Sequence, residues 1–202
     1  MSAFDISQPK LLVFFVGYPG AGKTQLANRL SEEMGSVLLS ADAARLRVFG
    51  SNERVDDALR ESEIEAYDHL YGALFYCTEQ ILRSGRSVIL DGQFSRKSDR
   101  KILTHIAVEF NALPVLIHLQ TPRRICDQRL LTRRRGADSR RFTRAQIAAV
   151  FDHFHARLEQ PTAGELVLSM SGQIDSDKQL EMFFEYVDIQ SRNRTGGSSY
   201  AA

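Results

Sequence analysis

The sequence predicts a three-layer α/β fold in which helices cover both faces of a five-stranded parallel sheet. Five apolar segments alternate with longer stretches of helical periodicity, and the first apolar segment ends in a glycine-rich turn. The apolar segments are continuous, which is typical of strands buried on both faces. Regular strand-helix alternation favours parallel strands joined by right-handed crossovers. At 202 residues, 43% of them hydrophobic, the chain can form one full-sized core.

The apolar pattern places each element in chain order. The predicted strands are residues 11–16, 37–40, 87–91, 114–119 and 165–170. The predicted helices are residues 23–34, 42–49, 55–84, 98–110, 122–134, 143–159 and 177–189. In the longest of these, apolar and aromatic side chains recur every three or four residues. The sequence therefore predicts a single domain over residues 1–190.

The helix ends carry recognisable signals. Thr121 precedes a proline at a first helical position, and Thr143 precedes another apolar helical pattern, so both threonines are expected to be N-caps. Residues 191–202 contain few apolar side chains and are rich in Gly and Ser. We expect these last residues to form a disordered tail.

Charge and hydropathy exclude several classes of protein. The 26 Lys and Arg residues nearly cancel the 25 Asp and Glu residues, so no net field attracts nucleic acid or an anionic membrane to the whole chain. The apolar run at residues 11–16 is too short for a secretion signal or a membrane span. The two cysteines are far apart and lack the spacing of a zinc site. The expected compartment is the cytoplasm, with no membrane association.

A phosphate-binding loop follows the first predicted strand. Its residues satisfy the pattern G-x-x-x-x-G-K-[ST] and open a helix; they are Gly17, Tyr18, Pro19, Gly20, Ala21, Gly22, Lys23 and Thr24. Glycines let successive backbone N–H groups curl around a triphosphate, and the helix N-terminus adds partial positive charge. Lys23 is expected to reach the β and γ phosphates, and the Thr24 hydroxyl to bind Mg²⁺. The sequence thus predicts a P-loop that binds ATP and Mg²⁺.

Motifs elsewhere in the chain favour phosphoryl transfer over hydrolysis. A GTPase would need a D-x-x-G switch and an N-K-x-D motif, and neither occurs. A motor or AAA+ ATPase usually has an acidic residue after the aspartate that ends its third strand, but here Gly92 follows Asp91. The signature of ABC proteins is also missing. An acceptor other than water is therefore favoured.

Two aspartates are expected at the same edge of the sheet as the P-loop. Asp91 ends an apolar strand and is predicted to hold Mg²⁺, although it could instead cap the turn at Gly92. Asp42 follows the second strand and is predicted to deprotonate an acceptor hydroxyl, with Arg45 on the same helical face binding the acceptor's charge. The alternative for this pair is an N-cap and its salt-bridge partner. Gln93, beside Asp91, is a further candidate for acceptor binding.

An arginine-rich segment is expected to form a lid. Residues 123–144 contain nine arginines and two acids, and residues 136–139 interrupt the helical pattern. A helix, a flexible turn and a second helix could close over the transferring phosphoryl group and exclude water. A basic patch for a nucleic-acid acceptor is the alternative, although Phe142 is the only aromatic residue within it.

These motifs together resemble a known group of proteins. The segments GYPGAGKT, SADAAR, SVILDGQF and TPRRICDQRLLTRRR are similar to those of P-loop kinases in the group of polynucleotide kinase, zeta toxin and chloramphenicol phosphotransferase. The resemblance implies the P-loop NTPase fold with sheet order 2-3-1-4-5, Asp42 as general base, and Arg45 as a ligand of the acceptor. It also implies that Arg129 lies against the adenine and that Arg133 reaches the phosphates.

The leading hypothesis is an ATP-dependent kinase whose acceptor is an unidentified small molecule or nucleic acid. Lys23, Asp42 and Arg133 would be catalytic. The alternatives are an ATP-binding regulatory or partner module and a weak ATPase, both without productive transfer. Neither the acceptor nor the oligomeric state follows from the sequence.

Overall fold

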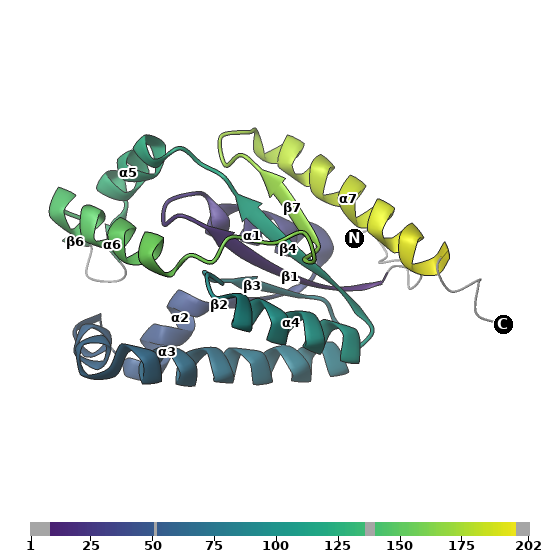
Figure 1. Cartoon of the computed structure of the whole chain (residues 1–202), viewed down its shortest axis with the longest axis horizontal. Helices are drawn as coiled ribbons and strands as arrows, with labels where there is room; N and C mark the ends of the chain where they lie inside the picture. The colour runs from purple at the N-terminus through teal and green to yellow at the C-terminus, as the bar shows by residue number, and fades with distance from the viewer. Residues whose placement is uncertain (1–8, 51, 136–139, 197–202) are drawn as a thin grey trace.

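A five-stranded parallel sheet forms the centre of the molecule. The computed structural model describes residues 9–50, 52–135 and 140–196 (Figure 1). The sheet order is β2-β3-β1-β4-β7, which confirms the predicted order 2-3-1-4-5. The strands are β1 (Lys10–Gly17), β2 (Val37–Ser40), β3 (Val88–Asp91), β4 (Ala112–Leu119) and β7 (Val167–Met170). All are parallel, so their carboxyl ends lie at one edge of the sheet.

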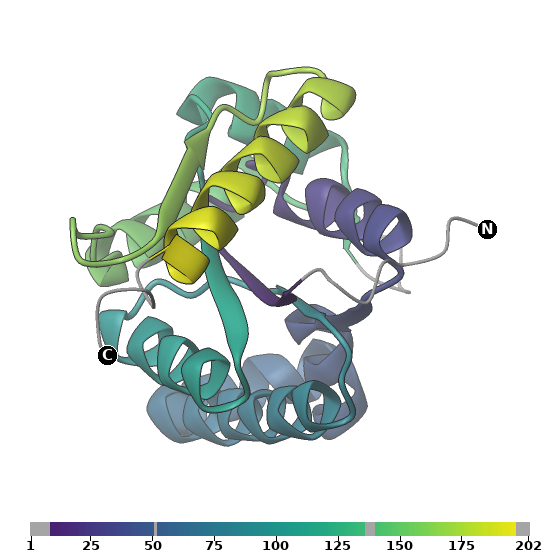
Figure 2. The ribbon, with the colours of Figure 1, turned by 90° about the vertical axis from the view of Figure 1, so that its right-hand side faces the viewer.

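Helices cover both faces of the sheet, as Figures 1 and 2 show. On one side, α1 (Lys23–Met34) and α7 (Ser176–Gly196) pack beside each other, and on the other lie α3 (Asn52–Arg83) and α4 (Lys97–Glu109). Side chains of β1 alternate between two apolar clusters, with Val13 and Phe15 in one and Leu12 and Phe14 in the other. This alternation explains the continuous apolar run of β1, because both of its faces are buried.

Three further helices complete the described part of the chain: α2 (Ala41–Phe49), α5 (Arg123–Thr132) and α6 (Arg144–Arg157). Thr143 caps α6 as predicted, in a capping box with Gln146. The prediction for Thr121 was wrong, because α5 has Pro122 at its N-cap and the Thr121 hydroxyl donates instead to the carbonyl oxygen of Ala21 at 2.9 Å.

The middle of the predicted lid differs from a helix-turn-helix. The first helix ends at Thr132, and Arg133 has extended backbone angles. The strands β5 (Arg134–Arg135) and β6 (Arg140–Arg141) then pair antiparallel as a small ribbon before α6. The predicted turn at residues 136–139 lies outside the described residues. The lid is therefore two helices joined through a β-ribbon, whose backbone pairing the helical periodicity of the sequence did not reveal.

The C-terminal helix is longer than predicted. Helix α7 continues to Gly196, into the segment expected to be disordered. The Arg194 guanidinium donates to the carbonyl oxygen of Ala112 at 2.9 Å, and Arg192 pairs with Asp188 one turn earlier. These polar contacts stabilise a segment that has little apolar content. The rest of the expected tail, residues 197–202, lies outside the described residues.

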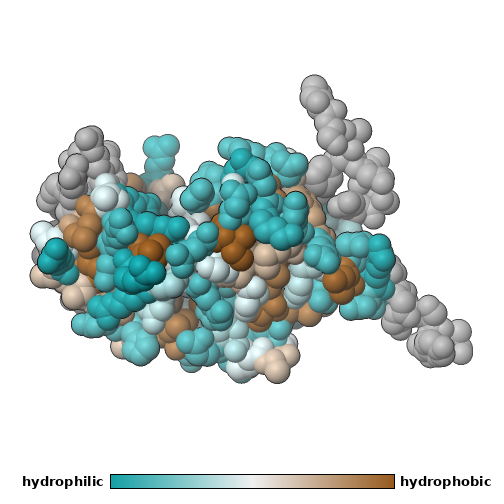
Figure 3. Space-filling view, turned by 90° about the horizontal axis from the view of Figure 1, so that it is seen from above, coloured by the Kyte–Doolittle hydropathy of each residue, from teal (hydrophilic) through white to brown (hydrophobic). Residues whose placement is uncertain are grey.

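The surface is consistent with the charge balance of the sequence. In the view of Figure 3, hydrophobic residues lie in small groups separated by hydrophilic ones. Among the residues that the structure describes, no helix has the length and apolar character needed to cross a membrane.

Candidate functional site

The P-loop lies where β1 ends and α1 begins, at the carboxyl edge of the sheet. Gly20 and Gly22 have φ angles of +83° and +110°, a region that side-chain-bearing residues rarely adopt. Lys23 is the first residue of α1, and its Nζ donates to the carbonyl oxygens of Gly17 at 2.9 Å and Tyr18 at 3.0 Å. The lysine thus bridges the two ends of the loop, in the conformation that a phosphate cradle requires.

Residues from two other strand ends hold this loop in place. The carbonyl oxygen of Ala21 accepts hydrogen bonds from Thr121 at 2.9 Å and from Arg129 at 3.1 Å. Arg129 also donates to the carbonyl oxygens of Gly20 at 3.3 Å and Gly172 at 2.9 Å. A Cβ at Gly172 would overlap Ala21 and Thr121, so the chain after β7 passes directly over the loop. Thr121 and Gly172 were missed in the sequence, where no motif marks them.

Lys23 is half-buried, and the pKa of its ammonium group is lowered. Burial lowers the pKa of its ammonium group to about 8, although the negative charges of Asp91 and Asp42 partly oppose this shift. The positive charge of Arg133 lowers it further. Lys23 therefore lies within electrostatic reach of all three of these predicted site residues.

We expect ATP binding to take up a proton above about pH 8. A triphosphate next to Lys23 favours its charged form, so the nucleotide raises a pKa that burial has lowered to about 8. ATP affinity should then fall as the pH rises above that value, by at most about tenfold per pH unit. Calorimetry at pH 8.5 to 9 in buffers of different ionisation enthalpy measures the proton uptake. Lys23→Met should abolish the uptake, and affinity independent of pH from 7 to 9.5 would contradict the lowered pKa.

Thr24 and Asp91 offer oxygen ligands for a magnesium ion. The Thr24 hydroxyl donates to Asp91 Oδ1 at 3.1 Å, although the threonine follows β1 and the aspartate ends β3. Burial raises the pKa of Asp91, while the hydrogen bond from Thr24 and the charges of Lys23 and Arg133 oppose the shift. Within the described residues there is no group of three acidic, His or Cys side chains that could hold a metal. A hydroxyl and one carboxylate fit Mg²⁺, which commonly binds one or two protein groups together with phosphate oxygens.

Asp42 lies in the first turn of α2 with its carboxylate exposed to solvent. Its Oδ1 is 3.0 Å from Arg45 Nη1, so the predicted pair is present on one helical face. Of the alternative, the N-cap was wrong, because Ser40 is the N-cap and accepts from the backbone N–H of Ala43. Its other half, a salt bridge between Asp42 and Arg45, is present. The charge of Asp42 reaches both Lys23 and Asp91. The carboxylate is therefore accessible and close to the phosphate cradle.

Two tyrosine side chains of α3 bind the loop that follows Asp91. Tyr67 and Tyr71 of α3 are stacked with ring centroids 3.9 Å apart, and both hydroxyls donate to the carbonyl oxygen of Gln93. Burial raises the pKa of both phenols, which keeps them protonated as donors. The Gln93 side chain donates to Ser95 Oγ at 3.2 Å. Whether Gln93 also contacts an acceptor stays a prediction.

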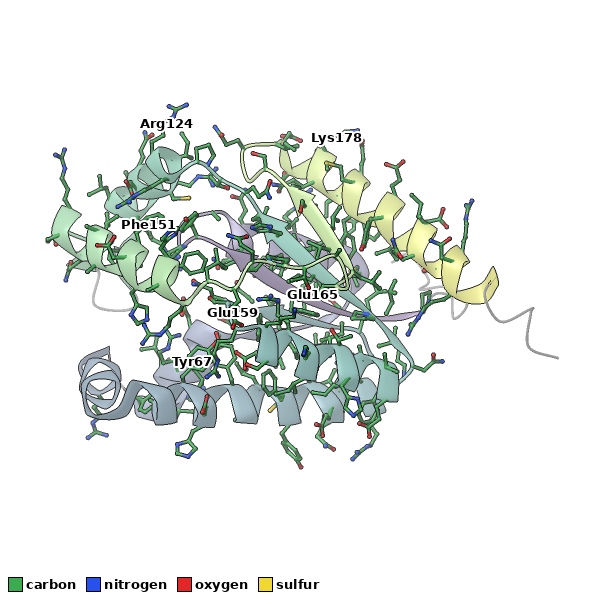
Figure 4. All side chains as sticks on the ribbon, in the orientation of Figure 1. Tyr67, Arg124, Phe151, Glu159, Glu165 and Lys178 are labelled. Carbon is green, nitrogen blue, oxygen red and sulfur yellow. The ribbon has the colours of Figure 1, made fainter. Side chains whose placement is uncertain are left out.

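A buried arginine of α4 holds the next two carbonyl groups of that loop. Arg100 is 1% exposed and donates to the carbonyl oxygens of Phe94 at 3.1 Å and Ser95 at 2.9 Å. It also pairs with Glu165 at 2.6 Å. Figure 4 shows Glu165 beside α4, although it precedes the distant strand β7. Three consecutive carbonyl groups after Asp91 are thus fixed, which makes the loop rigid.

The ion pair between Arg100 and Glu165 should make the stability of the folded protein depend on pH in the acidic range. Burial alone would raise the pKa of Glu165, but hydrogen bonds from Arg100 and Thr162 and the charge of Arg100 hold it below its usual value. A carboxylate with a lowered pKa in the folded state stabilises that state above the unfolded pKa of about 4.3, and this stability is lost as the pH falls through the folded value. We therefore expect the free energy of unfolding in urea to be higher for the wild type than for Glu165→Gln. The difference between the two should be constant from pH 7 to 5 and become smaller below about pH 4. A difference that stays constant down to pH 3 would contradict the lowered pKa.

The side chain of Tyr18 packs against α6. Its ring lies 5.0 Å from that of Phe151 and 4.8 Å from that of Phe154, both on α6, and its hydroxyl is 3.2 Å from His155 Nδ1. A cavity of about 320 Å³ adjoins it, lined by Tyr18, Arg123, Phe151, Asp152, His155 and Ala156. The sequence placed Tyr18 in the nucleotide site, and it did not reveal the cavity or the role of α6 in forming it.

Comparisons with known proteins identify the family and the fold. The model of a family described as AAA domain matches residues 12–161. No curated protein matches the sequence.

Several solved structures share the fold over most of the chain. A sugar kinase from Janibacter sp. has a TM-score of 0.67 at 19% identity, covering 90% of this chain and 96% of its own. A gluconokinase from Sinorhizobium meliloti has a TM-score of 0.67 at 14% identity, covering 94% and 98%. Kti12 from Chaetomium thermophilum, in complex with ADP-AlF3, has a TM-score of 0.66 at 18% identity, covering 88% and 97%. At such identities the likeness shows a common fold.

Proposed function

The chain belongs to the AAA domain family, and from this premise we propose that it is a kinase that transfers the γ-phosphoryl group of ATP to a hydroxyl group of an acceptor. Its P-loop fold is of the kinase type. The observation that carries the proposal is the hydrogen bond from Thr24 of the P-loop to Asp91 at the end of β3. The charges of Asp42, Asp91 and Arg133 also act on Lys23. A cytoplasmic location, where ATP is abundant, is part of the proposal.

Each of these residues has a distinct task in the proposed reaction. The P-loop amides and Lys23 bind the phosphates, and Asp42 accepts the proton of the attacking hydroxyl. The acceptor oxygen bonds to the γ-phosphorus while the bond from that phosphorus to the β,γ-bridging oxygen breaks, and ADP leaves. Arg133, which begins the extended segment after α5, would stabilise charge on the transferring group.

Magnesium and the adenine involve two further groups of residues. Thr24 and Asp91 would hold Mg²⁺, which when bound neutralises charge on the phosphates. The N–H groups of Arg129 are engaged with the carbonyl oxygens of Gly20, Ala21 and Gly172, so the plane of its guanidinium is fixed beside the P-loop. A fixed guanidinium plane suits stacking against a base, which supports the proposed contact with the adenine.

The contacts around Asp91 favour an acceptor other than water. The residue after it is Gly92, so no second carboxylate is available at the end of β3 to polarise a water molecule. The exposed carboxylate lies on α2, a separate element at the side of the cradle.

The test is transfer of label from [γ-³²P]ATP to a panel of 5′-OH oligonucleotides, nucleosides, aminoglycosides, sugars, sugar acids and peptides. The expected result is a labelled acceptor that requires Lys23, Asp42 and Mg²⁺. Steady phosphate release without any labelled acceptor would point to a weak ATPase instead. Nucleotide-dependent capture of a partner with no transfer would point to a regulatory module.

A further inference from the structure

The cavity beside Tyr18 belongs to the P-loop on one side and to the lid helices on the other. Tyr18 provides one wall, and its own carbonyl oxygen accepts a hydrogen bond from Lys23 at 3.0 Å. Arg123 comes from the first position of α5, and the remaining residues of the wall come from α6. Figure 4 shows Phe151 between these two helices. A molecule in the cavity would thus contact the side chain of a P-loop residue.

The size of the cavity suits a small molecule. Its volume of about 320 Å³ is at the lower end of the range of ligand sites in proteins. The volume accommodates a six-carbon compound together with a few water molecules, and it is too small for a folded segment of a partner protein.

The polar groups of the cavity have hydrogen-bonding capacity to spare. Asp152 has no hydrogen bond or ion pair among the described residues, and its side chain is exposed to the cavity. Arg123 is 3.8 Å from Asp127, beyond hydrogen-bond distance, so its N–H donors are not used by that carboxylate. His155 contacts Tyr18 through Nδ1 and has Nε2 left for a ligand. A ligand with several hydroxyl groups and one anionic group would match these partners.

The aromatic rings of the wall do not offer a free face to a nucleobase. The ring of Tyr18 lies between those of Phe151 and Phe154, and the guanidinium of Arg123 covers Phe151 at 4.8 Å from its centroid. Stacking on an open aromatic face is the main way in which single-stranded nucleic acid binds without sequence preference. The wall therefore favours hydrogen bonding to a polyol over stacking of a base.

We propose that this cavity binds the acceptor as a small polyhydroxylated compound with one anionic group, which Arg123 holds while Asp152, His155 and Tyr18 bind its hydroxyl groups. This inference rests on the proposed kinase function, because it assigns the acceptor class of that reaction. The anionic group is a carboxylate or a phosphate, and both make bidentate contacts with a guanidinium.

Three compounds with the same six-carbon chain test the proposal: D-gluconate, sorbitol 6-phosphate and sorbitol. Binding is measured by calorimetry on the full chain, with Mg²⁺ and β,γ-methylene ATP filling the P-loop so that anions cannot bind there. At least one anionic compound should bind about tenfold or more tightly than sorbitol, as expected for a charge-assisted contact. No binding of any of the three at about 10 mM, or equal binding of all three, would overturn the proposal.

Matched variants locate the binding site. Arg123→Gln should weaken binding of the anionic compound about tenfold or more, and Asp152→Asn should weaken binding of all three compounds. Arg124→Gln is the control, since Arg124 points outward from the neighbouring position of α5 and does not line the cavity (Figure 4). An equal loss in Arg124→Gln, or no loss in either cavity variant, would show that the site lies elsewhere.

The binding experiment tests the cavity assignment, and the transfer experiment tests the kinase function separately. If an anionic polyol binds in a manner that depends on Arg123 but no compound of the wider panel accepts label, the cavity assignment holds and the proposed transfer is wrong. If label reaches an oligonucleotide or peptide while none of the three polyols binds, the kinase holds and the cavity assignment is wrong.

Discussion

Replacing Asp42 with asparagine is expected to lower the rate of phosphoryl transfer by about 10²- to 10⁴-fold, the range for loss of a general base. The amide keeps the size of the carboxylate and its contact with Arg45, but it cannot accept the proton of an acceptor hydroxyl. Affinity for ATP should be unchanged, because the P-loop and Lys23 hold the phosphates. Transfer is measured in single-turnover experiments with the acceptor that the labelled panel identifies, and ATP affinity by calorimetry.

Two further variants distinguish a base from a residue that merely supports the site. Arg45→Gln breaks the same ion pair and keeps the carboxylate, so kcat and KM should both stay much closer to the wild-type values than in Asp42→Asn. Glu109→Gln, an exposed change at the end of α4, should leave both constants unchanged. The role of Asp42 as a base would be wrong if its asparagine variant transferred phosphate at the wild-type rate.

Replacing Arg100 with methionine is expected to destabilise the protein by about 3–5 kcal/mol, the typical cost of removing one partner of a buried ion pair. Methionine fills much of the volume, but Glu165 and the carbonyl oxygens of Phe94 and Ser95 lose their donor. For a chain of this length, such a loss corresponds to a fall in Tm of roughly 10 °C. Chemical denaturation and calorimetric melting measure the two quantities.

Lys101→Met is the matched control for this change. Lys101 is the next residue of α4 and is exposed, so its replacement should change the stability by no more than about 0.5 kcal/mol. Hydrogen exchange at residues 92–96 adds a local measurement. If Arg100→Met leaves both the midpoint of denaturation and that exchange unchanged, then the buried pair does not hold the loop after Asp91.

Local patterns in the sequence were sufficient to predict the sheet and its main helices. The continuous apolar run of β1 reports burial on two faces, and glycines at required positive φ angles mark the P-loop. Thr24 and Asp91 were both predicted to hold Mg²⁺, and they are in contact because their strands are neighbours, as the sheet order implied by the resemblance required. These features depend on residues close together in the chain or on the parallel order of the strands.

Features made by distant residues could not be predicted in this way. In the sequence, Arg100 and Glu165 are two separate charged residues that no local pattern connects. They become a buried pair only because the chain before β7 packs against α4. Thr121 resembled a helix cap because its neighbour is proline, yet Ala21 offers its hydroxyl a better partner. The β-ribbon in the lid depends on pairing across residues 136–139, whose composition indicated only a turn.

The contact of Gly172 with the P-loop also affects when the nucleotide site is completed during synthesis of the protein. The P-loop leaves the ribosome before the segment after β7 that covers Ala21, which follows roughly 150 residues later. At a translation rate of about 5–20 residues per second, the two are separated by roughly 10–30 seconds. During that interval a nascent chain carries a P-loop that lacks the contact with Gly172.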